Sequence, residues 1–296
     1  MLVKRERCRQ PKAGGKKLYL MLDEELQQNS INIGRDKFMN IIKRHQMLVV
    51  RKKKFVKTTQ SFHRFYKYPN IIKGLKISRP EQVWVSDITY VRVGVRWNYL
   101  FLITDAYSKK IMGYYLADNM RAENAVIALQ MALKNRIYPD SKLIHHSDRG
   151  FQYCCYDYTD ILEEHEIGIS MTENGDPYEN AIAERVNGIL KDEFEIENIY
   201  LTEVQATKEI EAVIAVYNQV RLHQSCGYIT PEQAHNKGTY VLPDWRKKRK
   251  FEQPQMAEGN CLYRSKDQLT VTSSDGSTET TKASGEQITR CIKKSK

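Results

Sequence analysis

Three acidic residues, in a strand-like run, at the end of a second such run and in a helix-like segment, are candidates for a shared functional site. Asp87 lies in the middle of the apolar run VWVSDITYV, where a buried charge is costly unless it is paired or bound to a metal. Asp148 ends the run KLIHHSD, and Glu184 lies inside PYENAIAERVNGILKDEFE. If the three acids met at one sheet edge, they would repel one another unless a cation neutralised them. Because oxygen-only ligand sets favour Mg²⁺ or Mn²⁺ over zinc, we take these residues as candidate metal ligands.

Each acid also has an ordinary explanation when it is taken alone. A single Asp in a strand is more often an edge residue or a turn former, and Asp148 can form a turn before Gly150. An isolated Glu on a helix is usually solvated. The three acids together, each on a suitable element and in a suitable order, favour a shared site.

The expected helix around Glu184 has one polar side. Asn180, Asn187, Gly188 and Lys191 lie at −4, +3, +4 and +7 from Glu184, so they share its stripe. Such a stripe suits metal ligation at its centre and contacts to phosphates or bases beside it. The opposite side carries residues that we expect to hold the helix against a sheet, namely Ile182, Ala183, Val186, Ile189 and Leu190.

The segments that must position these acids alternate between strand and helix patterns. Three β-rich runs within 83–118 have turns at 93–94 and 108–110, and the next helix has Ala125, Ala128, Leu129 and Ala132 on one stripe. The later elements are a helix over 121–136, a strand over 142–148, a helix over 156–167, a strand over 168–172, and a helix over 177–195 that begins near Pro177. The order βββ-α-β-α-β-α predicts an α/β fold with a mixed sheet and helices on its faces, as in RNase H-like domains.

Charge divides the chain into three regions, which we expect to be domains over residues 1–79, 80–240 and 241–296. Residues 1–79 hold 21 Lys and Arg against 5 Asp and Glu, whereas the remainder holds 26 against 31. A segment so basic favours polyanion binding through counterion release, although a merely solvated charged surface is the alternative. The Ser/Thr/Lys-rich region 241–296 is expected to be a basic, loosely ordered tail.

The basic segment predicts two helices, over 16–28 and 34–48, separated by SINI. In the second helix an apolar face is expected to hold Phe38, Ile41, Ile42 and His45. The opposite face carries Lys37, Asn40, Lys43 and Arg44. This pattern suits a helix-turn-helix DNA reader, but ordinary helical hairpins share it. The following RKKKFVK is a candidate flexible arm along phosphates.

Composition also excludes several classes of protein. No run of 18 apolar residues is present, so a membrane span is not expected, and the N-terminus lacks the apolar core of a secretory signal. The six cysteines are scattered and fit neither a disulfide framework nor a four-ligand zinc site, so we expect reduced thiols. A cytosolic protein is the default expectation.

The sequence resembles the second-frame transposase of the IS-three group of bacterial insertion sequences, within the retroviral-integrase (DDE) superfamily. The matching stretches are WVSDITY, WNYLFLITDAYSKKIMGY, IHHSDRGFQY, NAIAERVNGILKDE, IGRDKFMNIIKRHQML and YNQVRLHQSCGYITPEQA. Thirty-five residues separate Asp148 from Glu184, the gap characteristic of that family. The resemblance covers roughly residues 15–240. Phe151 and Arg185-Val186 depart from the residues frequent in the family, and the tail has no counterpart.

The resemblance implies a DNA transposase that cuts the ends of a mobile element and joins them to a target. In this hypothesis two Mg²⁺ (or Mn²⁺) ions assist in-line displacement, one held by Asp87 and Asp148 and the other by Asp87 and Glu184. Lys191 would contact the terminal DNA, and His146 and Arg149 are candidate phosphate contacts, with a core role equally open for the histidines. The implied partners are double-stranded DNA, further copies of the chain, and an upstream first-frame protein, fused or separate. The implied location is the bacterial cytoplasm, at the nucleoid when active.

Two other classes share some of these features. An RNase H-like nuclease would use the same acids but would release its products without strand joining. A non-catalytic DNA-binding regulator would use residues 15–60 and keep the core as a scaffold, which predicts missing acids. All three acids are present.

Overall fold

The computed structural model describes residues 2–49, 64–173 and 180–237, together with the backbone of 261–264, 268–272 and 278–282. The chain divides into two compact units, one of residues 1–49 with 255–296 and one of residues 50–254. Each unit has its own buried apolar cluster. No helix among the described residues is both long and apolar enough to cross a membrane.

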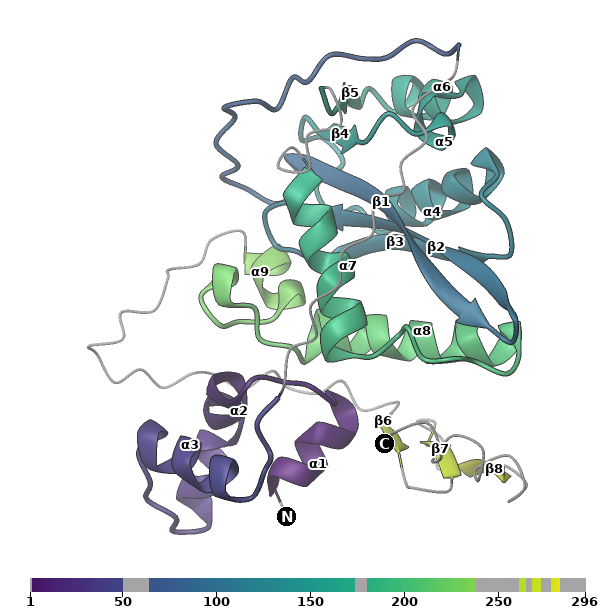
Figure 1. Ribbon diagram of the computed structural model, residues 1–296. Helices are drawn as coiled ribbons and strands as arrows, with labels where there is room; N and C mark the ends of the chain where they lie inside the picture. Colours follow the sequence, from purple (N-terminus) through teal and green to yellow (C-terminus); the bar gives the residue numbers. More distant parts are fainter. Residues whose placement is uncertain are drawn as a thin grey trace. The chain divides into compact units, whose positions relative to one another are not determined.

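The larger unit is built on a five-stranded mixed sheet, which confirms the predicted fold class (Figure 1). The strands lie in the order β3-β2-β1-β4-β5. The pairs β1–β2 and β2–β3 are antiparallel, whereas β1–β4 and β4–β5 are parallel. Their bounds are β1 (Val83–Val93), β2 (Arg96–Asp105), β3 (Ile111–Ala117), β4 (Ile144–Ser147) and β5 (Gly168–Met171).

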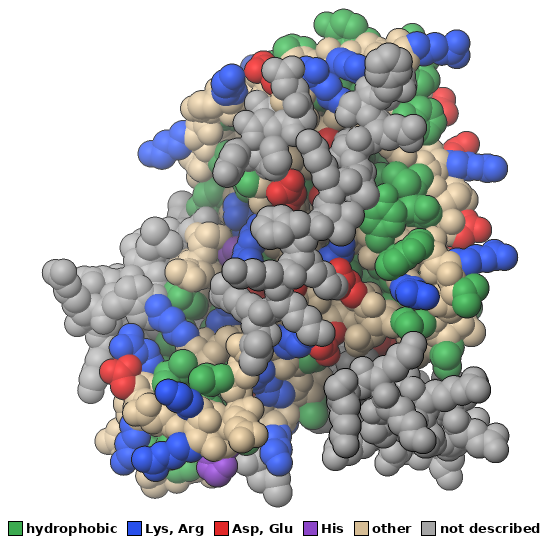
Figure 2. All heavy atoms as spheres, viewed as in Figure 1, with side chains coloured by type: hydrophobic (Ala, Val, Ile, Leu, Met, Phe, Trp, Pro, Cys, Tyr) green, Lys and Arg blue, Asp and Glu red, His purple; other side chains and the backbone are tan. Residues whose placement is uncertain are grey.

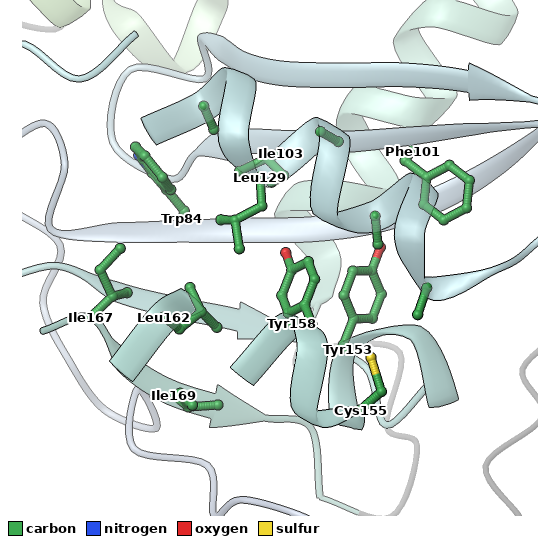
Figure 3. Close-up of a cluster of buried hydrophobic side chains, with 14 of the residues drawn as sticks. Trp84, Phe101, Ile103, Leu129, Tyr153, Cys155, Tyr158, Leu162, Ile167 and Ile169 are labelled. Atoms are coloured by element: carbon green, nitrogen blue, oxygen red, sulfur yellow. The ribbon is translucent and has the colours of Figure 1, made fainter. Parts of the chain in front are cut away.

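Alternation along the strands sends apolar side chains to both faces of this sheet. On one face Trp84 and Phe101 pack with residues of α4 (Ala122–Lys134), α5 (Phe151–Cys154) and α6 (Tyr156–Glu164). Figure 3 shows this cluster, with Leu129, Tyr153 and Tyr158 among its members. The predicted stripe of the α4 helix is buried here, as expected.

The other face of the sheet carries two long helices. Val91 and Leu100 pack there against α7 (Ala181–Glu193) and α8 (Glu203–Gln219). The short helices η2 (Gln224–Cys226) and α9 (Pro231–Lys237) follow. The sequence analysis did not predict α5, α8 or α9, and Pro177, the expected start of the Glu184 helix, lies outside the described residues.

Residues 64–79 contact the sheet unit, although their charge grouped them with the basic N-terminal segment. The Ile71 N–H donates to Ser170 Oγ at 3.1 Å, and Phe65 and Tyr68 pack against the cluster on the α4 face. Ile72 also joins a small apolar cluster at the start of β1. The domain boundary at residue 79 stays a prediction.

The described residues 2–49 of the smaller unit, called the N-terminal unit below, form helices α1 (Leu2–Arg9), α2 (Gly15–Gln28) and α3 (Arg35–Arg44). The sequence predicted α2 and α3 but not α1. Their common core contains Leu18, Leu22, Phe38 and Ile42. Ile41 and His45 are exposed, so the expected apolar face of the α3 helix is narrower than predicted.

The basic face of the α3 helix has the predicted exposure. Lys and Arg side chains crowd the surface around α2 and α3 in Figure 2. The four candidate DNA contacts on the α3 helix are all exposed, namely Lys37, Asn40, Lys43 and Arg44. The arm RKKKFVK lies outside the described residues.

The tail contains regular structure that its composition did not predict. Strands β6 (Cys261–Arg264), β7 (Gln268–Thr272) and β8 (Thr278–Lys282) form a three-stranded antiparallel sheet. Cys8, Cys154, Cys155 and Cys226 are free thiols, as expected.

Candidate active site

Strand pairing brings the two aspartates to the same place on the sheet. Strands β1 and β4 run parallel, and their last paired residues are Val85 and His146. Continuing this register by two residues sets Asp87 level with Asp148, and neighbouring strands lie about 4.8 Å apart. β4 ends at Ser147 whereas β1 continues to Val93, so Asp148 follows the strand end directly beside Asp87.

A tight turn orients Asp148. The Gly150 N–H donates to Asp148 Oδ1 at 2.9 Å, and Gly150 then caps the start of the α5 helix. A Cβ at Gly150 would lie only 2.9 Å from that oxygen and 3.0 Å from Gln152 Oε1. A larger residue at position 150 would therefore require these two side chains to shift.

Both oxygens of Asp87 accept hydrogen bonds. Its Oδ1 accepts from the Ile88 N–H at 2.9 Å, and its Oδ2 accepts from Asn187 Nδ2 at 2.7 Å. The Asn187 side chain is buried, and Asp87 itself is half-buried. The carboxylate is thus held in one orientation by a residue one hundred positions later in the chain.

Two amides fix the α7 helix against β1, and Glu184 lies between them. Asn180 Nδ2 donates to the Ser86 carbonyl at 3.1 Å, and Asn187 donates to Asp87. Because Glu184 lies four residues after Asn180 and three before Asn187, it shares their helix face. The opposite side contributes buried residues, which confirms the predicted apolar face: Ala183, Val186, Ile189 and Leu190.

The pKa of Asp87 is affected by the negative charges of the other two acids. Burial raises the pKa of Asp87 to about 7, and the negative charges of Asp148 and, to a smaller extent, Glu184 act in the same direction. The hydrogen bonds from Ile88 and Asn187 oppose this rise in pKa. Burial also raises the pKa of Glu184. Asp148 and Glu184 are therefore close enough to Asp87 to disfavour its ionised form.

The three carboxylates do not form a ready-made coordination shell. Within 2–49, 64–173 and 180–237, no group of three His, Cys, Asp or Glu side chains is placed to hold a metal ion.

The two histidines before Asp148 belong to the core. His145 Nε2 lies 2.6 Å from Ser86 Oγ and 2.9 Å from the Tyr158 hydroxyl, and burial lowers the pKa of His145 to about 3, so it is neutral. His146 is fully buried, with Nδ1 2.9 Å from Ser170 Oγ. His146 therefore packs in the core, one of the two roles that the sequence left open, and a phosphate contact by His146 stays a prediction.

The remaining candidate DNA contacts differ in exposure. Arg149 and Lys191 are partly exposed, and Lys191 Nζ lies 3.8 Å from Glu197 Oε1. Asn180 and Asn187 are buried and donate within the protein. For all four residues a DNA contact stays a prediction.

The sequence analysis missed an ion pair that fixes the end of the α7 helix. Arg221, which is almost fully buried, donates from Nε and Nη2 to the two carboxylate oxygens of Glu193, each at 2.9 Å. The signal for it was an arginine between apolar neighbours in YNQVRLHQ. This pair anchors the helix that carries Glu184.

Comparison with known proteins gives matches over most of the larger unit. Two Integrase core domain family models match, one over residues 77–177 and one over residues 165–231. The 31 kDa protein of insertion element IS600 from Shigella sonnei is 37% identical over 218 residues, which cover 73% of this chain and 80% of that protein. The transposase InsF for insertion sequence IS3A from Escherichia coli K12 is 37% identical over 161 residues, and the match spans 56% of its length.

Solved structures of viral integrases resemble the chain at low identity. The catalytic core domain of HTLV-2 integrase, solved in complex with magnesium, has a TM-score of 0.43 and 17% identity, covering 53% of this chain and 97% of that one. A chain of the simian T-cell lymphotropic virus intasome has a TM-score of 0.47 and 14% identity, covering 91% of this chain and 92% of that one.

Proposed function

The chain belongs to the IS3 family of insertion-sequence transposases, which act in DNA recombination through an RNase H-like integrase core, and from this premise we propose that it cleaves the ends of a mobile element and joins them to target DNA. The proposed catalytic residues are Asp87, Asp148 and Glu184. The observation that supports them most directly is the raised pKa of Asp87, which reflects burial beside two further carboxylates.

These three acids fit a divalent-cation site. Their donor atoms are all carboxylate oxygens, which suit Mg²⁺ or Mn²⁺, and their mutual repulsion is the interaction that bound cations would relieve. We propose that Asp87 and Asp148 hold one ion and that Asp87 and Glu184 hold a second. Ions so held would lower the pKa of the attacking oxygen and neutralise charge that builds on the phosphate.

The residues around the acids position them for this task. Asn187 holds one oxygen of Asp87, the Gly150 N–H holds one oxygen of Asp148, and Asn180 ties the start of the α7 helix to Ser86. Such contacts limit the number of orientations that each ligand must give up when a cation binds. Arg149 and Lys191, at the rim of this site, are proposed to contact DNA phosphates.

The N-terminal unit is proposed to bind the inverted repeats at the ends of the element. Its exposed basic α3 face would contact double-stranded DNA in the manner of a recognition helix. We further propose that several copies of the chain act together on DNA in the bacterial cytoplasm, alone or with an upstream first-frame protein. The predicted division at residues 79/80 and 240/241 is kept as part of this proposal.

The direct test is a strand-transfer assay with oligonucleotides that carry the element's inverted repeats, in Mg²⁺. Asp87→Asn, Asp148→Asn and Glu184→Gln should each abolish cutting and joining, whereas Asp192→Asn, an exposed acid on the α7 helix, should retain both. Parental activity in all three variants would refute the assignment. Cutting without any joining would favour a nuclease, and DNA binding without cutting would favour a regulator.

A second readout does not depend on turnover. Mg²⁺ should raise the melting temperature of the parent protein, because it relieves repulsion among the carboxylates, and should do so much less for Asp87→Asn. An equal Mg²⁺-dependent rise in both proteins would show that the ions bind elsewhere.

A further inference from the structure

The hairpin formed by β1 and β2 carries a row of aromatic side chains on one face. In the strand register Tyr90 pairs with Tyr99 and Arg92 pairs with Trp97, so these four side chains lie on the same side of the sheet. The ring centroids of Tyr90 and Tyr99 lie 5.3 Å apart, and those of Tyr90 and Trp97 lie 6.2 Å apart. We call these three rings, Tyr90, Trp97 and Tyr99, the aromatic platform.

The cluster that the α4 helix covers reaches only the inner margin of the aromatic platform. Ile88 and Tyr99 pack against that cluster, whereas Tyr90 and Trp97 belong to none of the buried apolar clusters among the described residues. Trp97 is 53% exposed, and both tyrosines are half-buried. The hairpin then continues to its turn, beside the chain that enters the α8 helix (Figure 1). Aromatic surface left uncovered in one patch marks a binding site.

The charge on this hairpin is entirely positive. Residues 88–104 contain two arginines, Arg92 and Arg96, and no Asp or Glu. Both arginines are exposed, and neither forms an ion pair within the part of the chain that the structure describes. The Arg92 guanidinium lies 5.7 Å from the centre of the Trp97 ring. A guanidinium placed over an exposed ring suits a phosphate group whose base stacks beside it.

We propose that the aromatic platform binds unpaired nucleotides of single-stranded DNA, with bases on the rings and a phosphate on Arg92. Every base has a flat π face, so stacking on aromatic side chains tolerates any sequence, and aromatic rings on a sheet serve this purpose in other nucleic-acid-binding domains. Paired bases in a duplex are already stacked on one another, so they cannot use this surface. The inference rests on the proposed function only in its choice of DNA as the partner.

The aromatic platform is separate from the candidate active site but near it along the chain. Asp87 pairs with Leu102, and both side chains lie on the α7 face of the sheet, opposite to Tyr90. Tyr90 follows Asp87 by three residues, which is about 10 Å along the strand. Because β4 pairs with β1 only as far as Val85, no described strand covers the edge of β1 between Asp87 and Tyr90. A DNA strand with a phosphate at the acids therefore has the aromatic platform within reach of its next nucleotides.

The test measures binding of single-stranded DNA in EDTA, where no Mg²⁺ is available and the proposed catalysis makes no contribution. A short fluorescent oligo(dT) should bind the full-length parent protein, and Trp97→Ala should weaken this binding about tenfold, because one stacked base loses its ring. Trp97→Phe keeps a ring and should bind within a few-fold of the parent. Unlabelled oligo(dT) should quench the tryptophan fluorescence of the parent, and Trp97→Phe should remove that quenching, since Trp84 is fully buried.

The two arginines of the hairpin provide a matched pair of variants. Arg96 pairs with Val93 and so lies on the face opposite to Arg92 and Trp97. Arg92→Ala should therefore weaken oligo(dT) binding, whereas Arg96→Ala, with the same loss of charge, should not. Equal losses in the two variants would overturn the proposal, because net charge alone would then explain the binding. Circular dichroism of each variant excludes unfolding as the cause.

Other outcomes also decide the matter. A parent that does not bind oligo(dT), or equal binding by the parent, Trp97→Ala and Arg92→Ala, overturns the proposal and leaves this face to a protein partner. The result is separable from that of the proposed function. Normal oligo(dT) binding by a protein that is inactive in strand transfer would refute the proposed catalysis alone, and strand transfer by a protein that binds no oligo(dT) would refute the aromatic platform alone.

Discussion

The protonation state of His235 follows from its hydrogen-bond partners. His235 is fully buried in the α9 helix, with Nε2 3.3 Å from Glu81 Oε1 and Nδ1 3.0 Å from Ser108 Oγ. The Ser108 hydroxyl already donates to Asp105 Oδ1 at 2.7 Å, so its oxygen can only accept from His235. Both ring nitrogens must therefore donate, which requires an imidazolium.

The pKa of His235 has the matching sign. Burial lowers the pKa of His235, but the carboxylates of Asp105, 3.7 Å from Nδ1, and of Glu81 outweigh burial and leave the pKa above its ordinary value of 6.5. For Glu81, burial raises the pKa, but hydrogen bonds from His235, the Ile137 N–H and Arg136 leave it below its ordinary value. The interaction of His235 with its acids therefore stabilises the fold fully below pH 6.5, and this stabilisation is lost as pH rises through the folded-state pKa.

We predict that His235→Gln lowers the free energy of unfolding most at low pH. Removal of one member of a buried ion pair costs about 3–5 kcal/mol. Because Gln can still donate one hydrogen bond, we expect the lower end, about 3 kcal/mol, which is about 6–12 °C in melting temperature for a unit of this size. Thermal unfolding followed by circular dichroism at pH 5.5, 6.5, 7.5 and 8.5 measures the difference between parent and variant.

The difference should be largest at pH 5.5 and should shrink as pH rises. His165→Gln, at an exposed histidine after the α6 helix, is the matched control and should show no such trend. A difference that stays constant or grows with pH would mean that His235 is neutral in the folded protein, and the hydrogen-bond assignment would be wrong.

Three further predictions concern packing. Arg221→Met removes the buried guanidinium that pairs with Glu193 and should cost about 3–5 kcal/mol in urea unfolding. Arg221→Met with Glu193→Leu should recover much of this loss, and no recovery would mean that the two residues are not coupled. Gly113→Ala should cost about 3 kcal/mol or prevent folding, because its Cβ would lie 2.1 Å from the Ala128 carbonyl oxygen. Gly188→Ala, whose Cβ would have nothing within 4 Å, should instead stabilise the α7 helix by about 0.5–1 kcal/mol. Equal effects of the two variants in thermal unfolding would contradict this packing. Leu22→Ala should destabilise the N-terminal unit by about 2–5 kcal/mol, and hydrogen exchange should report the loss there and not in β1.

Local patterns were sufficient to predict most elements that carry the candidate site. The run VWVSDITYVRV predicts a strand over the same residues as β1, and the Ala/Leu stripe of the α4 helix is buried as its 3.6-residue period requires. Three acids, on β1, after β4 and on the α7 helix, also led to the candidate site, and their catalytic role stays a prediction. These signals succeed because periodicity and an out-of-place charge are properties of a few neighbouring residues.

Contacts between residues that are distant in the sequence could be found only from the tertiary structure. Nothing local to Asn187 indicates that its amide binds Asp87 rather than DNA, since that bond depends on how the α7 helix lies against β1. In the same way, the register of β1 against β4 buries His146, and the pairing of Tyr200 with Val93 joins the chain before the α8 helix to the end of β1. The amino-acid sequence by itself determined which groups carry charge and on which kind of element, because those are local properties. Only the packed chain decided which of them meet, because strand register and helix docking are set by the whole core at once.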